Sequence, residues 1–145
     1  MFSKILVAAD GSESSLLASK YAASLATKLG CKVTLIHVVE PTPFPFTYGG
    51  ITQEQRRQIE QQIKESGRAI LRLNQKPLAD SQVPAELELR EGRPGDMICQ
   101  FAEEGEFDLI IIGNRGSGMV SRVLLGSVSQ EVVRAAPCPV LVVRV

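Results

Sequence analysis

Short apolar runs alternate with longer amphipathic segments along the chain. Five such runs are predicted to be strands, and they cover Ile5 to Ala9, Val33 to Val39, Ala85 to Leu89, Leu109 to Ile112 and Val140 to Val143. Continuous apolar runs of this length are typical of parallel strands that are buried on both faces. Their alternation with helical segments therefore predicts an α/β fold, in which helices cover both faces of a parallel sheet.

Four helices are predicted between these strands. In the first, Ser14 to Leu29, large apolar residues recur every four positions and are expected to face the core; they are Leu17, Tyr21, Leu25 and Leu29. Gly30 follows, where a helix end favours a left-handed residue. The other three are predicted from about Thr52 to Gln75, from Pro94 to Gly105, and from near Ser127 to a point before Pro137. The spacing of Ser127 and Gln130 indicates a capping box at the start of the last helix.

Parallel strands joined by helices require right-handed crossovers, which for five strands favours a doubly wound sheet. The binding crevice of such a sheet lies beyond the carboxyl ends of its strands. No composition shift or repeat divides the chain, so residues 1–145 are expected to form one domain.

Composition and charge narrow the function classes. The 145 residues are 44% hydrophobic, and 16 Lys and Arg residues balance 16 Asp and Glu residues. This balance is unlike that of proteins that bind nucleic acids or acidic membranes. No signal peptide and no apolar run of roughly 20 residues is present, so a cytoplasmic location is expected. The isolated Cys31, Cys99 and Cys138 predict neither a metal site nor a disulfide framework, and are interpreted as small buried apolar residues.

A glycine-rich segment follows the fourth strand. Gly113 ends that strand, Gly116 follows after two residues, and Gly126 follows after nine more. Glycine lets backbone N–H groups approach an anion closely and leaves φ free to turn them inward. Ser127 then opens a helix whose free N–H groups favour a phosphate, and the hydroxyls of Ser127 and Ser129 are further donors. The alternative is an ordinary turn between a strand and a helix.

Known phosphate-binding patterns do not describe this segment. The segment contains no lysine, which excludes the lysine-bearing P-loop. The exit of the first strand also lacks the G-x-G-x-x-G pattern of dinucleotide enzymes. The glycines therefore predict a phosphate cradle without a catalytic lysine.

Charged residues near the strand ends are further candidates. Asp10 is expected to face the crevice and to accept hydrogen bonds from an exocyclic amine or a ribose hydroxyl. A helix cap or turn before Gly11 is the alternative, and one carboxylate can serve both. Arg115 and Arg122 are interpreted either as phosphate partners or as solvated surface arginines.

The chain's one histidine and an aromatic cluster are more ambiguous. His37 lies in an apolar strand without a recognisable nucleophile nearby, so packing is favoured over catalysis. Phe44, Phe46 and Tyr48 follow the second strand, where they are interpreted as a lid over a base, a contact surface, or a packed loop.

These residues together resemble the universal stress protein family, in its ATP-binding form. The spacing of Gly113, Gly116, Gly126 and Ser127 matches that family's motif G-x2-G-x9-G-[ST]. The resemblance extends along nearly the whole chain, through KILVAADGS, IHVVE, DLIIIGNRG and CPVLVV. A proline often stands in the family where this chain has Ala8, which matters little because the contact there is through the backbone.

The resemblance implies an open, Rossmann-like five-stranded sheet in the order 3-2-1-4-5, and a homodimer paired through Val140 to Val145. Adenine and ribose are then expected against Ala8, Ala9, Asp10 and Val38, with Gly113 beside the ribose. The phosphates are expected near Ile112, Arg115, Gly116, Gly126, Ser127, Val128 and Ser129, with Mg²⁺ or Mn²⁺ as an ion that bridges them. The apolar terminal strand independently favours pairing, because a monomer would leave its edge open.

The expected function is that of a regulatory protein whose bound ATP, AMP or ADP alters the surface offered to an unidentified partner protein. The alternative is an ATP hydrolase. Its turnover is expected to be slow, because no water-activating base is evident near the glycines. A structural dimer with a vestigial pocket is a third reading, which the complete glycine set disfavours. No catalytic residue and no metal ligand is predicted.

Overall fold

The computed structural model describes residues 2–41, 50–116 and 125–145. Within them five parallel strands form a sheet in the order β3-β2-β1-β4-β5. The strands are β1 (Lys4–Ala8), β2 (Lys32–Val39), β3 (Ala85–Glu91), β4 (Leu109–Gly113) and β5 (Val140–Val143). The expected architecture and strand order are confirmed. Arg122 and the aromatic residues Phe44, Phe46 and Tyr48 lie outside the described residues.

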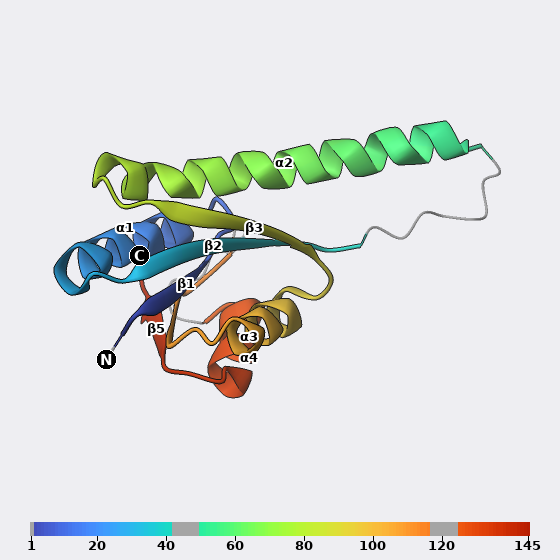
Figure 1. Ribbon diagram of the computed structural model, residues 1–145. Helices are drawn as coiled ribbons and strands as arrows, with labels where there is room; N and C mark the ends of the chain where they lie inside the picture. Colours follow the sequence, from blue (N-terminus) through green and yellow to red (C-terminus); the bar gives the residue numbers. More distant parts are fainter. Residues whose placement is uncertain (1, 42–49, 117–124) are drawn as a thin grey trace.

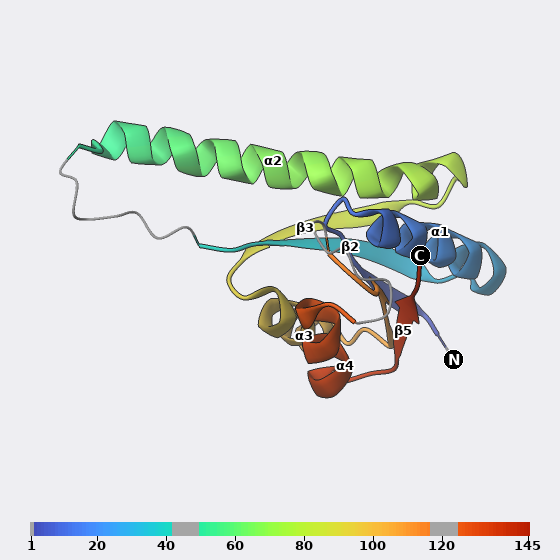
Figure 2. The same ribbon diagram turned by 180° about the vertical axis from the view of Figure 1, so that it is seen from behind.

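Helices cover both faces of this sheet. They are α1 (Glu13–Leu29), α2 (Gln53–Asp80), α3 (Pro94–Glu104) and α4 (Ser127–Ala135). Helices α1 and α2 lie on one face and α3 and α4 on the other, as Figure 1 and the reverse view in Figure 2 show. The amino-terminal part of α2 extends past the ends of β2 and β3 in both views.

The strands supply a separate hydrophobic core to each face. Successive side chains of a strand point to opposite faces. Accordingly Ile5 and Val7 of β1 pack beneath α1 and α2, whereas Leu6 and Ala8 pack toward α3 and α4. Ile5, Leu6 and Val7 are fully buried, because β1 is the central strand. The continuous apolar run in the sequence thus reflects burial on both faces.

The buried face of α1 differs from the predicted one. Its core-facing residues are all small, and they are Ser14, Ser15, Ala18, Ser19, Ala22, Ala23 and Ala26. Of the predicted stripe, Tyr21 is 48% and Leu29 53% exposed, while Leu17 and Leu25 are only partly buried. Small side chains occupy this face because α1 lies close to both β4 and α2. The predicted end of the helix at Leu29 is confirmed, and Gly30 after it has a left-handed φ of 71°.

Helix α2 is longer than predicted. It begins after Thr52, whose side chain and that of Gln55 form a reciprocal capping box. It continues through Pro77 to Asp80, five residues beyond the predicted end at Gln75. The pattern of large apolar residues fades before this last section, where Leu78 is fully buried.

The predicted capping box at the start of α4 is wrong. Gly126, not Ser127, is the N-cap residue, and no side chain caps the helix there. The Gln130 side chain instead donates to the carbonyl oxygen of Leu125 at 2.8 Å. This shift of one residue leaves the first N–H groups of α4 without a side-chain acceptor, which matters for the site described next.

Candidate functional site

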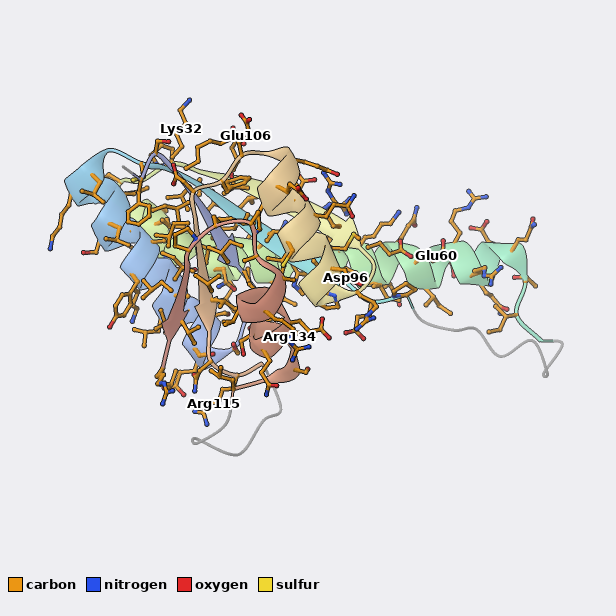
Figure 3. The ribbon with its side chains drawn as sticks, turned by 90° about the horizontal axis from the view of Figure 1, so that it is seen from below. Lys32, Glu60, Asp96, Glu106, Arg115 and Arg134 are labelled. Atoms are coloured by element: carbon orange, nitrogen blue, oxygen red, sulfur yellow. The ribbon has the colours of Figure 1, made fainter. Side chains whose placement is uncertain are left out.

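A cavity of about 330 Å³ opens at the carboxyl ends of the strands. The cavity lies between β1 and β4, where the order of the strands in the sheet reverses. Figure 3 shows Arg115 at this end of the molecule, opposite Lys32 and Glu106. All twelve residues predicted for the site line this one cavity, namely Ala8, Ala9, Asp10, Val38, Ile112, Gly113, Arg115, Gly116, Gly126, Ser127, Val128 and Ser129.

Seven further residues of the described part of the chain line the cavity and were not predicted. They are Ser12, Ser15, Ile36, His37, Glu40, Pro94 and Ile98. Ser12 and Ser15 follow Asp10 closely in the sequence, so the turn after β1 was the available signal. Pro94 and Ile98 belong to α3, which no motif connects to the glycine segment.

One wall of the cavity is apolar. It includes Ala8, Ile36, Val38, Ile98 and Ile112, which belong to the core beneath α3 and α4 and are all buried. An apolar wall beside a few polar groups is typical of small-molecule sites, and the volume lies within their range. This part of the cavity is suited to a flat, uncharged ring.

The turn after β1 carries Asp10. Its Oδ1 atom accepts a hydrogen bond from the N–H group of Ser12 at 2.8 Å, and the Ser12 hydroxyl accepts one from the N–H group of Ser15 at 3.2 Å. Gly11 between them has φ of 77°, which glycine adopts without strain. The turn-forming alternative for Asp10 is therefore present. The turn uses the Oδ1 atom of Asp10 as an acceptor, and the residue also lines the cavity.

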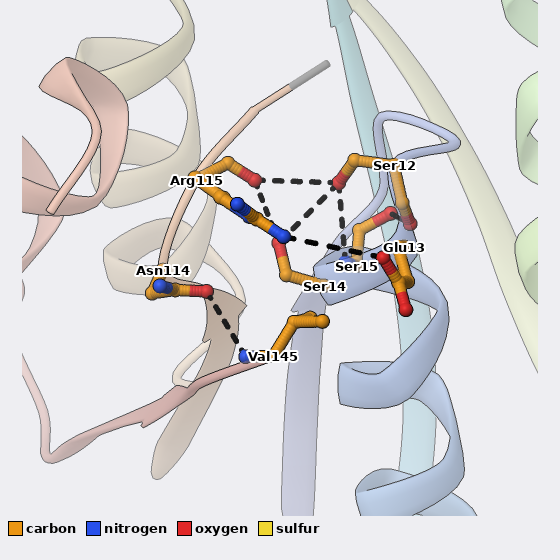
Figure 4. Close-up of polar contacts among 7 residues, drawn as sticks. All are labelled: Ser12, Glu13, Ser14, Ser15, Asn114, Arg115 and Val145. Atoms are coloured by element: carbon orange, nitrogen blue, oxygen red, sulfur yellow. Dashed lines mark hydrogen bonds and ion pairs between the residues drawn. The ribbon is translucent and has the colours of Figure 1, made fainter. Parts of the chain in front are cut away.

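The beginning of the glycine segment is held against the first turn of α1, as Figure 4 shows. The carbonyl oxygen of Arg115 accepts hydrogen bonds from the hydroxyls of Ser14 at 2.6 Å and Ser12 at 3.4 Å. The Arg115 guanidinium lies 4.0 Å from the carboxylate of Glu13, and only 16% of the arginine side chain is exposed. Arg115 is thus a partly buried cation at the cavity, not a solvated surface arginine.

Asn114 connects this segment to β5 and α4. Its backbone N–H donates to Val143, and its carbonyl oxygen accepts the N–H group of Gly126 at 2.7 Å. Its side-chain oxygen accepts the N–H group of Val145 at 3.4 Å. The residue is buried, and sequence reasoning missed it because a lone asparagine between a strand and a glycine has no distinctive pattern.

Two glycines of the segment, Gly113 and Gly116, lie close to other parts of the protein. Neither Gly113 nor Gly116 has a left-handed φ, and Gly126 has φ of −64°. A Cβ atom at Gly113 would lie 2.2 Å from Ser14 Oγ, so this glycine permits close packing of β4 on α1. A Cβ atom at Gly116 would lie 3.2 Å from Asp10 Oδ2. The predicted use of free φ angles is therefore wrong at these three glycines, whereas the close approach of their N–H groups to an anion stays a prediction.

The start of α4 supplies the polar side of the cavity. Ser127 is exposed at the first helical position, where N–H groups and the helix dipole favour an anion. The Ser129 hydroxyl does not act as predicted. It is buried and donates toward the carbonyl oxygens of Gly126 at 2.9 Å and Asn114 at 3.3 Å. A hydroxyl has one proton, so Ser129 has none left for a ligand.

His37 has the packing role that the sequence favoured. Its Nδ1 atom lies 2.7 Å from the carbonyl oxygen of Ala9. A carbonyl oxygen only accepts hydrogen bonds, so Nδ1 carries a proton and donates it. His37 therefore ties β2 to the end of β1 beside the cavity.

The cysteines provide no reactive group. Burial raises the pKa of the thiols of Cys31, Cys99 and Cys138, which keeps them protonated, and all three are free. Cys31 is buried as predicted, and the other two are partly buried. Within residues 2–41, 50–116 and 125–145, no three His, Cys, Asp or Glu side chains come together as a metal site. No helix among those residues is long and apolar enough to cross a membrane.

The sheet order and the cavity at its reversal point define a doubly wound α/β protein. The universal stress protein family model matches residues 1–144, and the chain belongs to that family. The universal stress protein MJ0531 of Methanocaldococcus jannaschii is 36% identical over 144 residues, which are 99% of this chain and 83% of the relative.

Solved structures agree with this assignment. The universal stress protein UspA from Lactobacillus plantarum has 26% sequence identity and a TM-score of 0.80, with 99% of this chain and 98% of that chain covered. A universal stress protein in complex with cAMP has 27% identity and a TM-score of 0.70, with 99% and 97% covered.

Proposed function

We propose that this protein binds an adenine nucleotide, ATP or else AMP or ADP, in the cavity at the carboxyl ends of its strands. The observation that carries the proposal is the joint presence of an apolar wall and an anion-favouring helix start in one cavity. An adenine ring suits the first, and phosphates suit the second. A similar universal stress protein binds cAMP, which supports an adenine nucleotide as the ligand.

The cavity suggests how the nucleotide is oriented. The base and ribose lie against Ala8, Ala9 and Val38, with Asp10 accepting hydrogen bonds from them and Gly113 beside the ribose. The phosphates lie near α4, and the residues around them are Ile112, Arg115, Gly116, Gly126, Ser127, Val128 and Ser129. Arg115 provides the positive charge. Because the Ser129 hydroxyl is committed within the protein, Ser129 acts through its backbone.

A divalent ion, Mg²⁺ or Mn²⁺, is part of the proposal as a companion of the phosphates. The described residues contain no cluster of metal-ligating side chains. Such an ion would therefore take its ligands mainly from phosphate oxygens and water, as Mg²⁺ commonly does. The ion would neutralise charge on the phosphates.

We infer that the bound nucleotide regulates the protein's interactions with a partner protein and is turned over slowly at most. Phosphoryl transfer requires positioned cations and a residue that orients the attacking group. Asp10 is the carboxylate beside Gly116, and its Oδ1 atom is engaged by the turn. Slow hydrolysis of ATP is the second candidate, with Asp10 as the group to test.

The decisive experiment is mass spectrometry of the ligand released from the purified protein by mild denaturation. An adenine nucleotide is expected, and bound ATP should persist for hours. Phosphate release faster than a few turnovers per minute would contradict a regulatory role. Gly116→Leu should abolish nucleotide binding without unfolding the protein, because the new side chain enters the cavity beside Asp10. Retained affinity in that variant would refute the proposed phosphate position.

We further propose that the protein forms a homodimer through residues 140–145. Strand β5 is an edge strand, paired with β4 on one side. Leu17 and Leu25 of α1 pack against the same core as Leu141 and are only partly buried. An apolar edge strand beside partly exposed apolar side chains favours a second copy as its cover.

A further inference from the structure

We propose that Asn74 is a positioning residue that sets the direction of the Asp10 carboxylate in the cavity. The inference rests on the nucleotide-binding function proposed above, because Asp10 acts there on the base or ribose. Asn74 belongs to α2 and does not line the cavity. Its side chain is nevertheless fully buried, which for an amide requires hydrogen-bond partners.

The Asn74 side chain makes three hydrogen bonds, all to residues 11–19. Its Oδ1 atom accepts the N–H group of Gly11 at 3.2 Å. Its Nδ2 atom donates to the hydroxyl oxygens of Ser15 and Ser19, each at 3.2 Å. A backbone N–H group only donates, so the bond to Gly11 determines which end of the amide is the oxygen.

The two serines accept these bonds because their own protons are used elsewhere. Ser15 Oγ donates to the carbonyl oxygen of Ser12 at 3.0 Å, and Ser19 Oγ donates to that of Ser15 at 3.3 Å. Both hydroxyl oxygens are left as acceptors that face Asn74. The position therefore calls for an oxygen on one side and an NH₂ group on the other, and a carboxylate of the same shape does not meet this need.

These bonds reach Asp10 from both of its flanks. Gly11 follows Asp10, and its left-handed conformation directs its N–H group to Asn74. The N–H group of Asp10 donates to Ser15 Oγ at 3.4 Å, the same oxygen that Asn74 binds. Within this turn, the N–H group of Ser12 donates to Asp10 Oδ1 and so holds the carboxylate. Loss of the Asn74 amide would release this turn, and the carboxylate would lose its fixed direction.

The test is a double-mutant cycle on ATP affinity with Asn74→Asp and Asp10→Ala. Asn74→Asp keeps the shape but removes two donors and places a charge in a buried site. Each single variant should lose about tenfold in affinity, the scale of a hydrogen bond to a charged group. If Asn74 acts through Asp10, the double variant should bind ATP no more weakly than Asp10→Ala alone.

Gln61→Glu is the matched control, because it makes the same chemical change at an exposed position of α2. It should leave ATP affinity unchanged. Should Asn74→Asp fail to fold, Asn74→Ala completes the same cycle without a buried charge, with thermal unfolding as the check on the fold. Hydrogen exchange of the Gly11 amide should accelerate in either Asn74 variant and not in Gln61→Glu.

The outcomes separate the inference from the proposed function. Additive losses in the double variant would overturn the positioning role, since Asn74 would then act independently of Asp10. The nucleotide-binding function would survive that result. Absence of ATP, ADP and AMP binding by the unaltered protein would overturn the proposed function and the inference with it.

Discussion

Gly113 at the end of β4 lies so close to Ser14 in the first turn of α1 that no side chain fits between them. A Cβ atom at position 113 would be 2.2 Å from Ser14 Oγ and 2.7 Å from the Ser14 carbonyl carbon. The same Ser14 hydroxyl donates to the carbonyl oxygen of Arg115 at 2.6 Å. This glycine therefore allows the segment that follows β4 to be held on α1, beside the cavity.

Gly113→Ala is expected to destabilise the protein by about 2 kcal/mol, the usual cost of forcing an extra carbon into a closely packed site. The cost should persist in the double variant Gly113→Ala with Ser14→Ala, because a backbone carbon as well as the hydroxyl obstructs the new methyl group. Urea unfolding of the two variants and of Ser14→Ala measures both values.

Gly30→Ala is the control for this prediction. Gly30 has no atom within 4 Å of an added Cβ, and its cost arises only from the left-handed φ of 71°. That cost should be about 1 kcal/mol. A smaller destabilisation for Gly113→Ala than for Gly30→Ala would contradict the close contact with Ser14.

The acid stability of the protein should depend on Asp108. Partial burial raises the pKa of this carboxyl, but hydrogen bonds from Ser3 and from the N–H group of Lys4 outweigh it and leave the pKa below its ordinary value. A pKa that is lower in the folded state stabilises the fold above the unfolded value of about 4. That contribution is lost as the pH falls through the lower, folded value.

Asp108→Asn should therefore lower the midpoint of thermal unfolding at neutral pH. The difference from the unaltered protein should shrink as the pH falls below about 4, where the carboxyl of the unaltered protein is protonated as well. Asp80→Asn, a change of an exposed aspartate at the end of α2, controls for the loss of one charge. A difference that stayed constant down to strongly acidic pH would rule out this linkage.

The proposed dimer predicts a difference between the two edges of the sheet. The carbonyl oxygens of Pro139 and Val143 accept hydrogen bonds from the N–H groups of Ile110 and Asn114, so these residues face β4. Because the backbone groups of successive residues point to opposite sides of a strand, the N–H group of Val142 is directed outward. Val142→Pro removes this donor and should convert the dimer to a monomer. Light scattering during size-exclusion chromatography measures the mass.

Leu87→Pro is the matched change on β3, the opposite edge of the sheet. Leu87 is 39% exposed. The N–H group of Gly92 donates to the carbonyl oxygen of Val39 on β2. Because N–H groups alternate in direction along a strand, the N–H group of Leu87 is directed outward, away from β2. This variant should remain a dimer. A monomeric Leu87→Pro and a dimeric Val142→Pro would move the interface to the other edge.

The sheet and the cavity could be predicted from sequence because they depend on patterns that repeat. Apolar runs mark the buried strands, and the carboxyl ends of parallel strands meet at one edge. Asp10 and Gly113 each follow such a run directly, which is why they line the same cavity. The residues that the family resemblance alone supplied are Ala8, Ala9, Val38, Ile112 and Val128.

Close packing and polar networks could not be predicted in the same way. Hydrophobicity made Tyr21 and Leu29 appear to face the core, whereas the narrow space under α1 admits only serine and alanine. Asn74 lies among polar residues in the sequence, so nothing in its immediate neighbours indicates that its amide is buried. A signal did exist, because Leu71, Asn74 and Leu78 follow the spacing of a buried helix face and are buried together.

The Arg115 side chain predicts a selectivity among adenine nucleotides. Its guanidinium is 16% exposed and 4.0 Å from a Glu13 carboxylate that is 78% exposed, so solvent weakens this ion pair. Loss of a charge-assisted contact to phosphate in Arg115→Gln should weaken ATP binding by about tenfold and AMP binding less, because ATP carries two more phosphates. Glu13→Gln, which removes the competing carboxylate, should strengthen ATP binding. Isothermal titration at two salt concentrations measures these effects, which should diminish at high salt. Equal losses for ATP and AMP in Arg115→Gln would place the arginine away from the outer phosphates.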